Sequence, residues 1–219
     1  MRVGETFGYG SLFYILKKVN TNFLATETKN IKGTQTEKNL LTAYLAESAA
    51  YSRYSFYAKA ANKEGYFPVE KVFEEIASNE LVHGKVFFKM LQGGRVEVPI
   101  NTDAGTLTTT IYNLNYAIEE EQREGYEFYT AAAKTATEEG FPEIASHFAA
   151  IAEVERHHRE RFIRYREMIL NGTLWKRELP VVWRCLVCGY EFVGTEPPKV
   201  CPGCDHPYQH YVCVDDLTL

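Results

Sequence analysis

The stretch from Ile144 to Tyr165, IASHFAAIAEVERHHRERFIRY, decides how the rest of the chain is interpreted. At helical spacing its large apolar residues fall on one face, and Glu155 and His158 fill two gaps in that face. A carboxylate and an imidazole are therefore expected on the buried side of a helix, where an unpaired charge is costly. The spacing Glu-x-x-His presents both groups one turn apart, as helix bundles present metal ligands. For this helix alone, a core histidine beside a buried ion-pair carboxylate is an equal alternative.

The same pattern occurs 75 residues earlier, where Glu80 and His83 interrupt another apolar stripe. The surroundings repeat as well. Glu64–Gly65 precede Glu80 by the same spacing with which Glu139–Gly140 precede Glu155. An internal repeat of this size indicates two copies of one helical hairpin.

Two further helices carry carboxylates in the same manner. Glu47 stands in an apolar stripe that runs from Leu40 to Ala58. Glu121 stands in a stripe that begins at Leu107, and Glu124 follows one turn later. Each of the four expected helices thus interrupts its own apolar face with glutamate.

The stripes and their stop signals predict four helices, the first capped by Thr34 or Thr36, over about 36–63, 68–92, 106–137 and 142–171. The connection that ends near Gly105 is longer than the two hairpin turns, which suits a bundle whose middle connection crosses from one end to the other. After a linker at 174–180, short alternating runs among Gly and Pro are typical of strands. We therefore expect three parts: an extension of unknown role (1–33), a helical bundle (34–173) and a small β module (180–219).

Composition excludes several classes of protein. The chain has 219 residues and a net charge of −5, so it lacks the basic character of a nucleic-acid-binding protein. No apolar run approaches the ~20 residues that a membrane-spanning helix needs. We therefore expect neither nucleic acid nor membrane as a partner.

The cysteines indicate a compartment. All five lie in the last 35 residues, which is typical of a metal site and not of a secreted disulfide framework. A reducing compartment, the cytoplasm, is the natural expectation. Residues 1–33 hold five basic and two acidic residues without the apolar region of a secretory signal, so an organelle presequence stays open.

Together the stripes place five carboxylates and two imidazoles toward one helical core: Glu47, Glu80, His83, Glu121, Glu124, Glu155 and His158. Five carboxylates in a low dielectric would repel each other strongly. Divalent cations remove that repulsion, and this ligand mixture suits iron or manganese. One Glu from each of two helices, with Glu-x-x-His from each of the other two, is the di-iron carboxylate arrangement. Carboxylates neutralised by protons in an ordinary core are the alternative.

A second set of candidate ligands lies near the C-terminus, in the pairs Cys185-x-x-Cys188 and Cys201-x-x-Cys204. Four thiolates in tetrahedral geometry bind zinc or iron, and a structural zinc ribbon stays open. The nearby residues Trp183, Tyr190, Phe192, Pro202 and Tyr208 are expected to form an aromatic core that keeps water from the metal. The fifth cysteine, Cys213, is expected to be a small buried residue.

Five motifs of the chain, taken together, resemble the rubrerythrin family. They are KGTQTEKNLLTAYLAES around Glu47, NELVH ending at His83, EEEQRE with Glu121 and Glu124, EVERHH ending at His158, and WRCLVCGY with CPGC. The resemblance extends from about Lys32 to the C-terminus. It implies a mainly α fold, with a ferritin-like four-helix bundle followed by a small rubredoxin-like four-cysteine β module. It also implies a di-iron centre in the bundle and one iron on Cys185, Cys188, Cys201 and Cys204.

The resemblance further implies a reaction, the reduction of hydrogen peroxide to water by a non-haem di-iron peroxidase. Electrons would enter through the four-cysteine iron from an electron-donor protein, a rubredoxin or a reductase, and ultimately from NAD(P)H. By the family motif, Glu124 is an extra carboxylate of an iron that changes ligands with redox state. Tyr54 and Tyr129 match tyrosines beside the cluster, although plain core aromatics explain their spacing equally well. A head-to-tail homodimer is the expected assembly.

The chain departs from the family pattern in two places: residues 1–31 have no counterpart, and Asp205 follows the last cysteine where a small residue is usual. Aspartate tolerates positive φ, so we expect the turn to form. Two other functions are weighed, a ferritin-like ferroxidase or iron-binding protein and an interaction protein with a zinc ribbon. The electron-entry module argues against the first, and the inward glutamates argue against the second.

Overall fold

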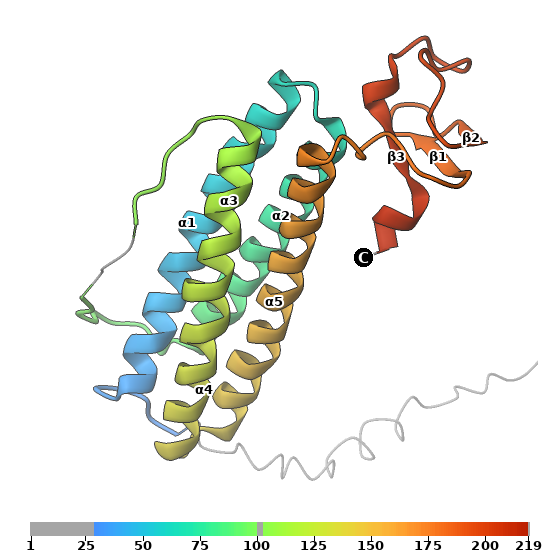
Figure 1. The fold of residues 1–219 in the computed structure, drawn as a ribbon. Helices are drawn as coiled ribbons and strands as arrows, with labels where there is room; N and C mark the ends of the chain where they lie inside the picture. The colour runs from blue at the N-terminus through green and yellow to red at the C-terminus, as the bar shows by residue number, and fades with distance from the viewer. Residues whose placement is uncertain (1–28, 100–102, 219) are drawn as a thin grey trace, which may run out of the picture. The chain divides into compact units, whose positions relative to one another are not determined.

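The structure of the chain is a computed structural model that describes residues 29–99 and 103–218. Four long helical segments form a bundle, and a small antiparallel sheet follows them, so the predicted fold class is confirmed (Figure 1). The helices are α1 (Gln35–Lys63), α2 (Phe67–Met90), a third divided into α3 (Thr110–Glu120), η1 (Glu121–Glu127) and α4 (Phe128–Glu138), and α5 (Pro142–Leu170).

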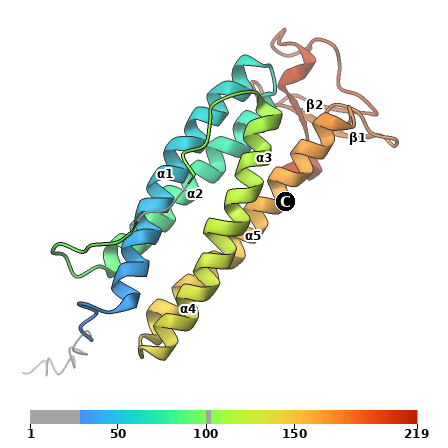
Figure 2. The same ribbon diagram turned by 60° about the vertical axis from the view of Figure 1, so that its left-hand side comes forward.

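Each half of the bundle is a helical hairpin, and the two hairpins turn in the same way. Gly65 and Gly140 adopt φ values of +80° and +77°, which end α1 and α4. Pro68 and Pro142 lie in the first turn of the helix that follows, where proline is tolerated. Figure 2 shows the resulting pairs, α1 beside α2 and α3–α4 beside α5.

The connection between the hairpins crosses the bundle as predicted. Its first described part, residues 91–99, leaves α2 at one end of the bundle, and its second, residues 103–109, leads into α3 at the other end (Figure 1). The phenol of Tyr57 donates a hydrogen bond of 3.0 Å to the carbonyl of Thr106 and attaches this connection to the bundle. As a result, α3 runs in the same direction as α2 (Figure 1). Its glutamates can therefore face the same core.

The third helix departs from the prediction in two respects. It begins at Thr110 and not near residue 106, because the Thr109 hydroxyl accepts a hydrogen bond from the Tyr112 amide and caps the helix there. Leu107, predicted on the buried face, precedes the helix and is 60% exposed. The segment η1 is a π-helix, a rare conformation that occurs often at functional sites.

The π segment accounts for a difference in length between the hairpins. Gly65 lies 18 positions after Glu47, whereas Gly140 lies 19 positions after Glu121. From these glycines to Glu80 and Glu155 the spacing is 15 positions in both hairpins. The second hairpin therefore has one additional residue in its first helix, and η1 is where the structure accommodates it.

Two apolar clusters fill the bundle, and a polar layer separates them. One cluster contains Phe73 of α2 and Phe162 of α5, and the other contains Phe87 of α2 and Phe148 of α5. On both helices the Glu-x-x-His residues lie between the two clusters. The carboxylates are thus enclosed by apolar side chains on either side along the bundle.

The C-terminal module is a three-stranded antiparallel sheet of order β2-β1-β3, with β1 (Val181–Cys185), β2 (Glu191–Gly194) and β3 (Tyr211–Cys213). Short 3-10 helices lie at Tyr208–His210 and Val214–Thr218. In the central strand, Trp183 pairs with Phe192 on one side and Cys213 on the other.

The predicted aromatic core of this module is wrong for four of its five members. Trp183 is fully buried, but Tyr190, Phe192 and Tyr208 are each more than a third exposed, and Pro202 is also exposed. The buried partners of Trp183 are Tyr211 and the cysteines Cys185, Cys201 and Cys213. A sheet this small covers one face only, so the aromatics on its other positions stay at the surface. Cys213 is buried, as expected.

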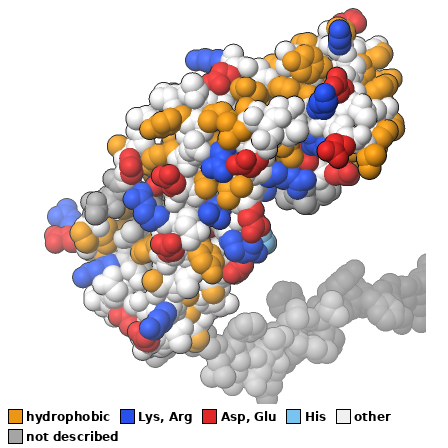
Figure 3. Space-filling view, in the orientation of Figure 1, with side chains coloured by type: hydrophobic (Ala, Val, Ile, Leu, Met, Phe, Trp, Pro, Cys, Tyr) orange, Lys and Arg blue, Asp and Glu red, His pale blue; other side chains and the backbone are white. Residues whose placement is uncertain are grey.

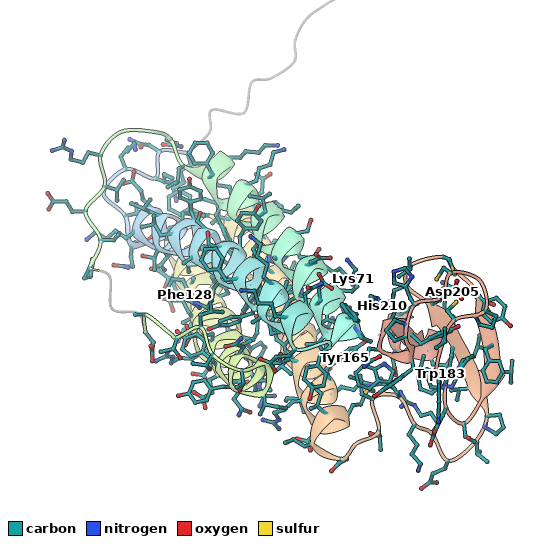
Figure 4. The ribbon with its side chains drawn as sticks, turned by 90° about the horizontal axis from the view of Figure 1, so that it is seen from above. Lys71, Phe128, Tyr165, Trp183, Asp205 and His210 are labelled. Atoms are coloured by element: carbon teal, nitrogen blue, oxygen red, sulfur yellow. The ribbon has the colours of Figure 1, made fainter. Side chains whose placement is uncertain are left out.

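The segment after α5 is packed and is not a free linker. Leu174 is buried in the bundle, and the Trp175 indole donates a hydrogen bond of 3.0 Å to the carbonyl of Tyr211 in β3. The ring of Phe67, at the start of α2, stacks on His210 of the module with centroids 3.6 Å apart. Figure 4 shows His210 on the side of the module nearest to α2. Asp216 adds an ion pair of 3.3 Å with Arg164 of α5. The module is therefore anchored to one end of the bundle.

In the described part of the chain, none of the helices has the length and hydropathy that would be required to cross a membrane.

Candidate metal centres

All six predicted bundle ligands whose side chains the structure describes meet in the polar layer. Each is at most 9% exposed, and they come from all four helical segments: Glu47 from α1, Glu80 and His83 from α2, Glu121 from η1, and Glu155 and His158 from α5. The residues that helical periodicity selected in the sequence therefore lie together in the structure. The seventh, Glu124, has its backbone in η1, but its side chain lies outside the described part of the structure.

The ligands form two groups that share two carboxylates. One group is Glu47, Glu80, His83 and Glu155, the other is Glu80, Glu121, Glu155 and His158, and within each group the ligand atoms lie within 4.8 Å of one another. Nδ1 of His83 lies 2.9 Å from Oε2 of Glu80 and 3.0 Å from Oε1 of Glu155. Nδ1 of His158 repeats these contacts, 2.9 Å from Oε2 of Glu155 and 3.0 Å from Oε1 of Glu80. Glu80 and Glu155 belong to both groups, so each could offer one oxygen to either of two metals.

The imidazole protons alone do not satisfy this arrangement. A ring nitrogen carries one proton, so each Nδ1 can serve only one of the two carboxylate oxygens beside it. Accordingly, Oε1 of Glu80 and Oε1 of Glu155 are buried without a hydrogen-bond partner among the described residues. A metal ion with ligand distances of ~2.1 Å places adjacent octahedral ligands about 3 Å apart, as these atoms are. The donor set and its spacing fit two cations.

The titration of the layer shows how closely its charges interact. Burial, reinforced by Glu80 and Glu155, holds the pKa of Glu47 and of Glu121 well above the usual range. Burial acts in the same direction on Glu80, but the two histidines prevail and lower its pKa to about 2. Burial would lower the pKa of His83, but its hydrogen bonds to Glu155 and Glu80 raise it to about 9. Without metal, protons therefore compensate charges that cations would otherwise balance.

Both predicted tyrosines contact the ligands. The phenol of Tyr54 donates a hydrogen bond of 2.7 Å to Oε1 of Glu121, and that of Tyr129 donates one of 2.7 Å to Oε1 of Glu47. Burial and the neighbouring carboxylates raise the pKa of each phenol well above its usual range, so both remain donors. Each tyrosine orients the glutamate that belongs to one group only.

Two residues at this centre were not predicted. The amide of Asn79 lies 3.3 Å from Nε2 of His158, and Gly125 lies against Glu155. Asn79 precedes a ligand directly and, by periodicity, belongs at the edge of the helix face, where polar residues are common. The signal for Gly125 was the unequal spacing of the two hairpins, together with a glycine in the middle of a helix.

The four predicted cysteines also meet. The sulfur of Cys185 lies 3.7 Å from that of Cys204, and the sulfur of Cys188 lies 3.6 Å from that of Cys201. A tetrahedral metal with metal–sulfur bonds of ~2.3 Å separates its sulfurs by about 3.8 Å. The spacing therefore fits one tetrahedral ion.

Backbone amides are directed at these sulfurs, as in metal-binding knuckles. Burial raises the pKa of Cys185 despite amide hydrogen bonds from Cys188 and Val187. The His206 amide favours the thiolate of Cys204, but burial and the neighbouring thiols raise its pKa to about 12. Four thiols in contact cannot all ionise unless a cation balances their negative charges. A bound metal ion is such a cation.

The turn after the second pair forms as predicted. Asp205 has a φ of +59° and is the only residue other than glycine with a positive φ in the described ranges. Its amide donates a hydrogen bond of 2.9 Å to the carbonyl of Cys201. Gly189 has a φ of +78° at the equivalent position after Cys188, so the two knuckles are alike.

Both sites lie in stretches of sequence that match known families. Residues 38–163 match the family model Rubrerythrin, and residues 183–212 match that of the rubrerythrin rubredoxin-like domain. The chain belongs to the rubrerythrin family. It is 42% identical to the rubrerythrin of Porphyromonas gingivalis over 84% of this chain and 92% of that protein. It is 40% identical to the rubrerythrin of Nitratidesulfovibrio vulgaris over 84% and 96%, respectively.

Solved structures agree with this assignment. The fully reduced, all-ferrous state of a nigerythrin aligns with a TM-score of 0.56 and 26% identity, over 86% of this chain and 91% of that one. As a rubrerythrin, the chain is an oxidoreductase whose cofactors are a di-iron centre in the bundle and one iron at the four cysteines. The individual ligands stay predictions, which the distances above support.

Proposed function

We propose that this rubrerythrin is a non-haem di-iron peroxidase that reduces hydrogen peroxide to water. The observation that carries the proposal is the pair of ligand groups joined through Glu80 and Glu155. Two metals held this closely can deliver two electrons together, the number that one peroxide takes up. When bound, the irons supply these electrons, and two protons complete the two water molecules.

The space beside the ligands suits a small substrate. A cavity of about 30 Å³ adjoins the carboxylates, and its remaining walls include Ala46, Ala50 and Arg53 of α1. This volume is that of about one water molecule, so the site has little room for an organic substrate. The two alanines leave the space open on the α1 side.

We further propose roles for the surrounding residues. Glu47, Glu80, His83, Glu121, Glu155 and His158 hold the two irons, and Glu124 is an additional carboxylate ligand of one of them. Tyr54 and Tyr129 hold the carboxylates of Glu121 and Glu47 in place through their hydrogen bonds. Because these phenols keep their protons, they remain hydrogen-bond donors to the two carboxylates.

The C-terminal module is proposed to be the entrance for electrons. The side chain of Cys188 reaches the surface, and Val187 and Val200 near it are about half exposed. Figure 3 shows hydrophobic side chains on the outer part of this module. An apolar surface around an exposed thiolate suits a transient redox partner, a rubredoxin or a reductase that draws on NAD(P)H.

We propose that electrons then cross between chains of a head-to-tail homodimer. From His158 to the end of α5 at Leu170 the helix rises ~18 Å, which is long for efficient tunnelling within one chain. The exposed residues Leu81 and Phe88, seven apart on one face of α2, give a partner chain apolar surface to cover. Two-fold dimers are also the commonest assemblies.

A single experiment tests the reaction. Protein is reconstituted anaerobically to three irons per chain, reduced, freed of reductant and mixed with hydrogen peroxide. We expect one peroxide to be consumed for every two electrons, with oxidation of the four-cysteine iron, which is red when oxidised. Peroxide loss at the rate of buffer, or iron accumulation as a ferric mineral under air, would instead indicate the ferritin-like function.

We place the reaction in the cytoplasm, as defence against oxidative stress, because the four thiols require reducing surroundings.

A further inference from the structure

Gly125 lies in η1 directly against Glu155. A Cβ atom at this position would be 2.7 Å from Cβ and 2.7 Å from Cγ of Glu155, closer than Cβ atoms approach other atoms in real structures. It would also lie 3.6 Å from Oε2 of Glu121. The atoms that it meets are the first two carbons of the glutamate, and the backbone of α5 fixes the position of Cβ, so that no rotation of the side chain relieves that contact.

Glu155, like Glu80, is a residue whose displacement would disturb both ligand groups. It belongs to both ligand groups, and its two oxygens lie 3.0 Å and 2.9 Å from the imidazoles of His83 and His158. A shift of its Cβ and Cγ would therefore move a ligand of both metals at once.

We propose that Gly125 is a positioning residue of the di-iron centre. Its missing side chain lets α5 approach the π segment closely enough for Glu155 to reach both metals. The extra residue of the second hairpin brings Gly125 to this point of contact. The inference concerns metal binding and does not depend on peroxide as the substrate.

The first hairpin offers a matched control. Gly84 of α2 faces Glu47 in a similar way, but a Cβ there would be 3.3 Å from Cβ of Glu47, a contact that a small shift relieves. Glu47 also belongs to one group only. Alanine at position 84 should therefore leave iron binding nearly unchanged, whereas alanine at position 125 should weaken it.

The test compares the full-length Gly125→Ala and Gly84→Ala proteins after anaerobic loading with Fe(II). For Gly125→Ala we expect at least tenfold weaker binding of bundle iron and loss of the magnetic coupling between the two irons. The four-cysteine iron should be retained and serves as the internal standard. The metal-free variant should still fold, with a melting temperature only moderately below that of the wild type, because the helix preference of alanine offsets part of the cost of the close contact. Gly84→Ala should bind iron within twofold of the wild type.

Three results would overturn the proposal. One is wild-type iron affinity and coupling in Gly125→Ala. Another is an equal loss of iron in Gly84→Ala, which would make close packing of glycine a general need of this core. The third is a metal-free Gly125→Ala chain that does not fold, which would make the glycine a requirement of the fold and not of the centre.

Discussion

The side-chain amide of Asn79 lies 3.3 Å from Nε2 of His158, the ring nitrogen that faces away from the carboxylates. The contacting atom is the amide nitrogen Nδ2, and a half-turn of the amide exchanges it with the amide oxygen. A histidine that binds metal through Nδ1 carries its proton on Nε2, and in this turned orientation the oxygen of Asn79 accepts that proton. The other copy of the motif has Val154 at the equivalent position, and valine cannot accept a hydrogen bond. The two histidines of the centre are therefore supported differently.

Replacement of Asn79 should weaken one metal site. Asn79→Leu removes the acceptor at similar volume, and we expect about 10- to 100-fold weaker binding of one of the two bundle irons. Asn79→Asp keeps an acceptor and should bind both irons as tightly as the wild type. Stepwise Fe(II) titration measures both variants. Equal affinities of Asn79→Leu and the wild type would show that His158 needs no support from this side.

The metal-free protein should lose stability as the pH rises. His83 has a folded-state pKa of about 9 against an ordinary value of 6.5, so its contribution is complete below pH 6.5 and is lost as the pH rises through 9. The raised pKa values of Glu47 and Glu121 act in the same direction above their ordinary 4.5. Each pKa unit corresponds to about 1.4 kcal/mol, so we expect the melting temperature to fall by several degrees between pH 6.5 and 9.

Metal should reverse this trend, because its ligands must be deprotonated and its affinity therefore rises with pH. Thermal denaturation of the iron-loaded and metal-free proteins across this range gives the comparison. A metal-free protein that becomes more stable toward pH 9 would contradict the charge assignment.

Each tyrosine at the centre should stabilise one carboxylate. In Tyr129→Phe the ring stays and only the donor to Glu47 is lost, so we expect the metal-free protein to lose about 1–3 kcal/mol, with Tyr54→Phe similar through Glu121. Chemical denaturation followed by circular dichroism measures the loss. Tyr57→Phe is the control, since its hydroxyl bonds the Thr106 carbonyl and no ligand. It should leave iron affinity unchanged, whereas the two test variants should lower it.

Glu124→Ala should separate metal binding from turnover. Glu121 remains as the η1 ligand, so we expect two bundle irons per chain but slower reduction of peroxide, measured by stopped flow. Glu127→Ala is the control, because Glu127 lies in the same segment with its side chain exposed. Peroxide reduction by Glu124→Ala at the wild-type rate would remove the proposed role of the extra carboxylate.

Mixed dimers should reveal the electron route. A chain with Cys185→Ala, which lacks the electron-entry iron, is combined with a chain with Glu155→Ala, which lacks a complete di-iron centre. If electrons cross between chains, the hybrid keeps one working pair and about half of the wild-type activity per dimer. A hybrid without electron flow, or full activity of a strict monomer in ultracentrifugation, would rule out the head-to-tail arrangement.

The positions of the buried carboxylates could be predicted from the sequence because a charged residue in an apolar helical stripe is easy to recognise. Glu155 and His158 were found in this way, and the structure buries both. The π segment was not predicted, because a single inserted residue hardly disturbs a stripe over two turns. The difference of 18 and 19 positions between the hairpins would have located it.

The small module shows a different limit. Strands of three to five residues give too few alternations to define a covered face, which explains why Phe192 of β2 is not in the predicted core. Tyr190 and Tyr208 lie outside the strands, where no alternation applies. The four cysteines, by contrast, follow from their spacing alone. Contacts such as Trp175 with Tyr211 join segments far apart in sequence, and no local pattern predicts them.

The sharing of Glu80 and Glu155 has a consequence for the origin of this centre. Neither hairpin holds a complete group of ligands, and exchanging the two hairpins would exchange the two groups. One hairpin sequence, present twice about a two-fold axis, would be sufficient to build such a centre, so a duplicated and fused gene accounts for it. The additional residue of η1 ends that equivalence. Two irons that an exact duplicate would hold identically have become distinguishable, and each can follow its own chemistry.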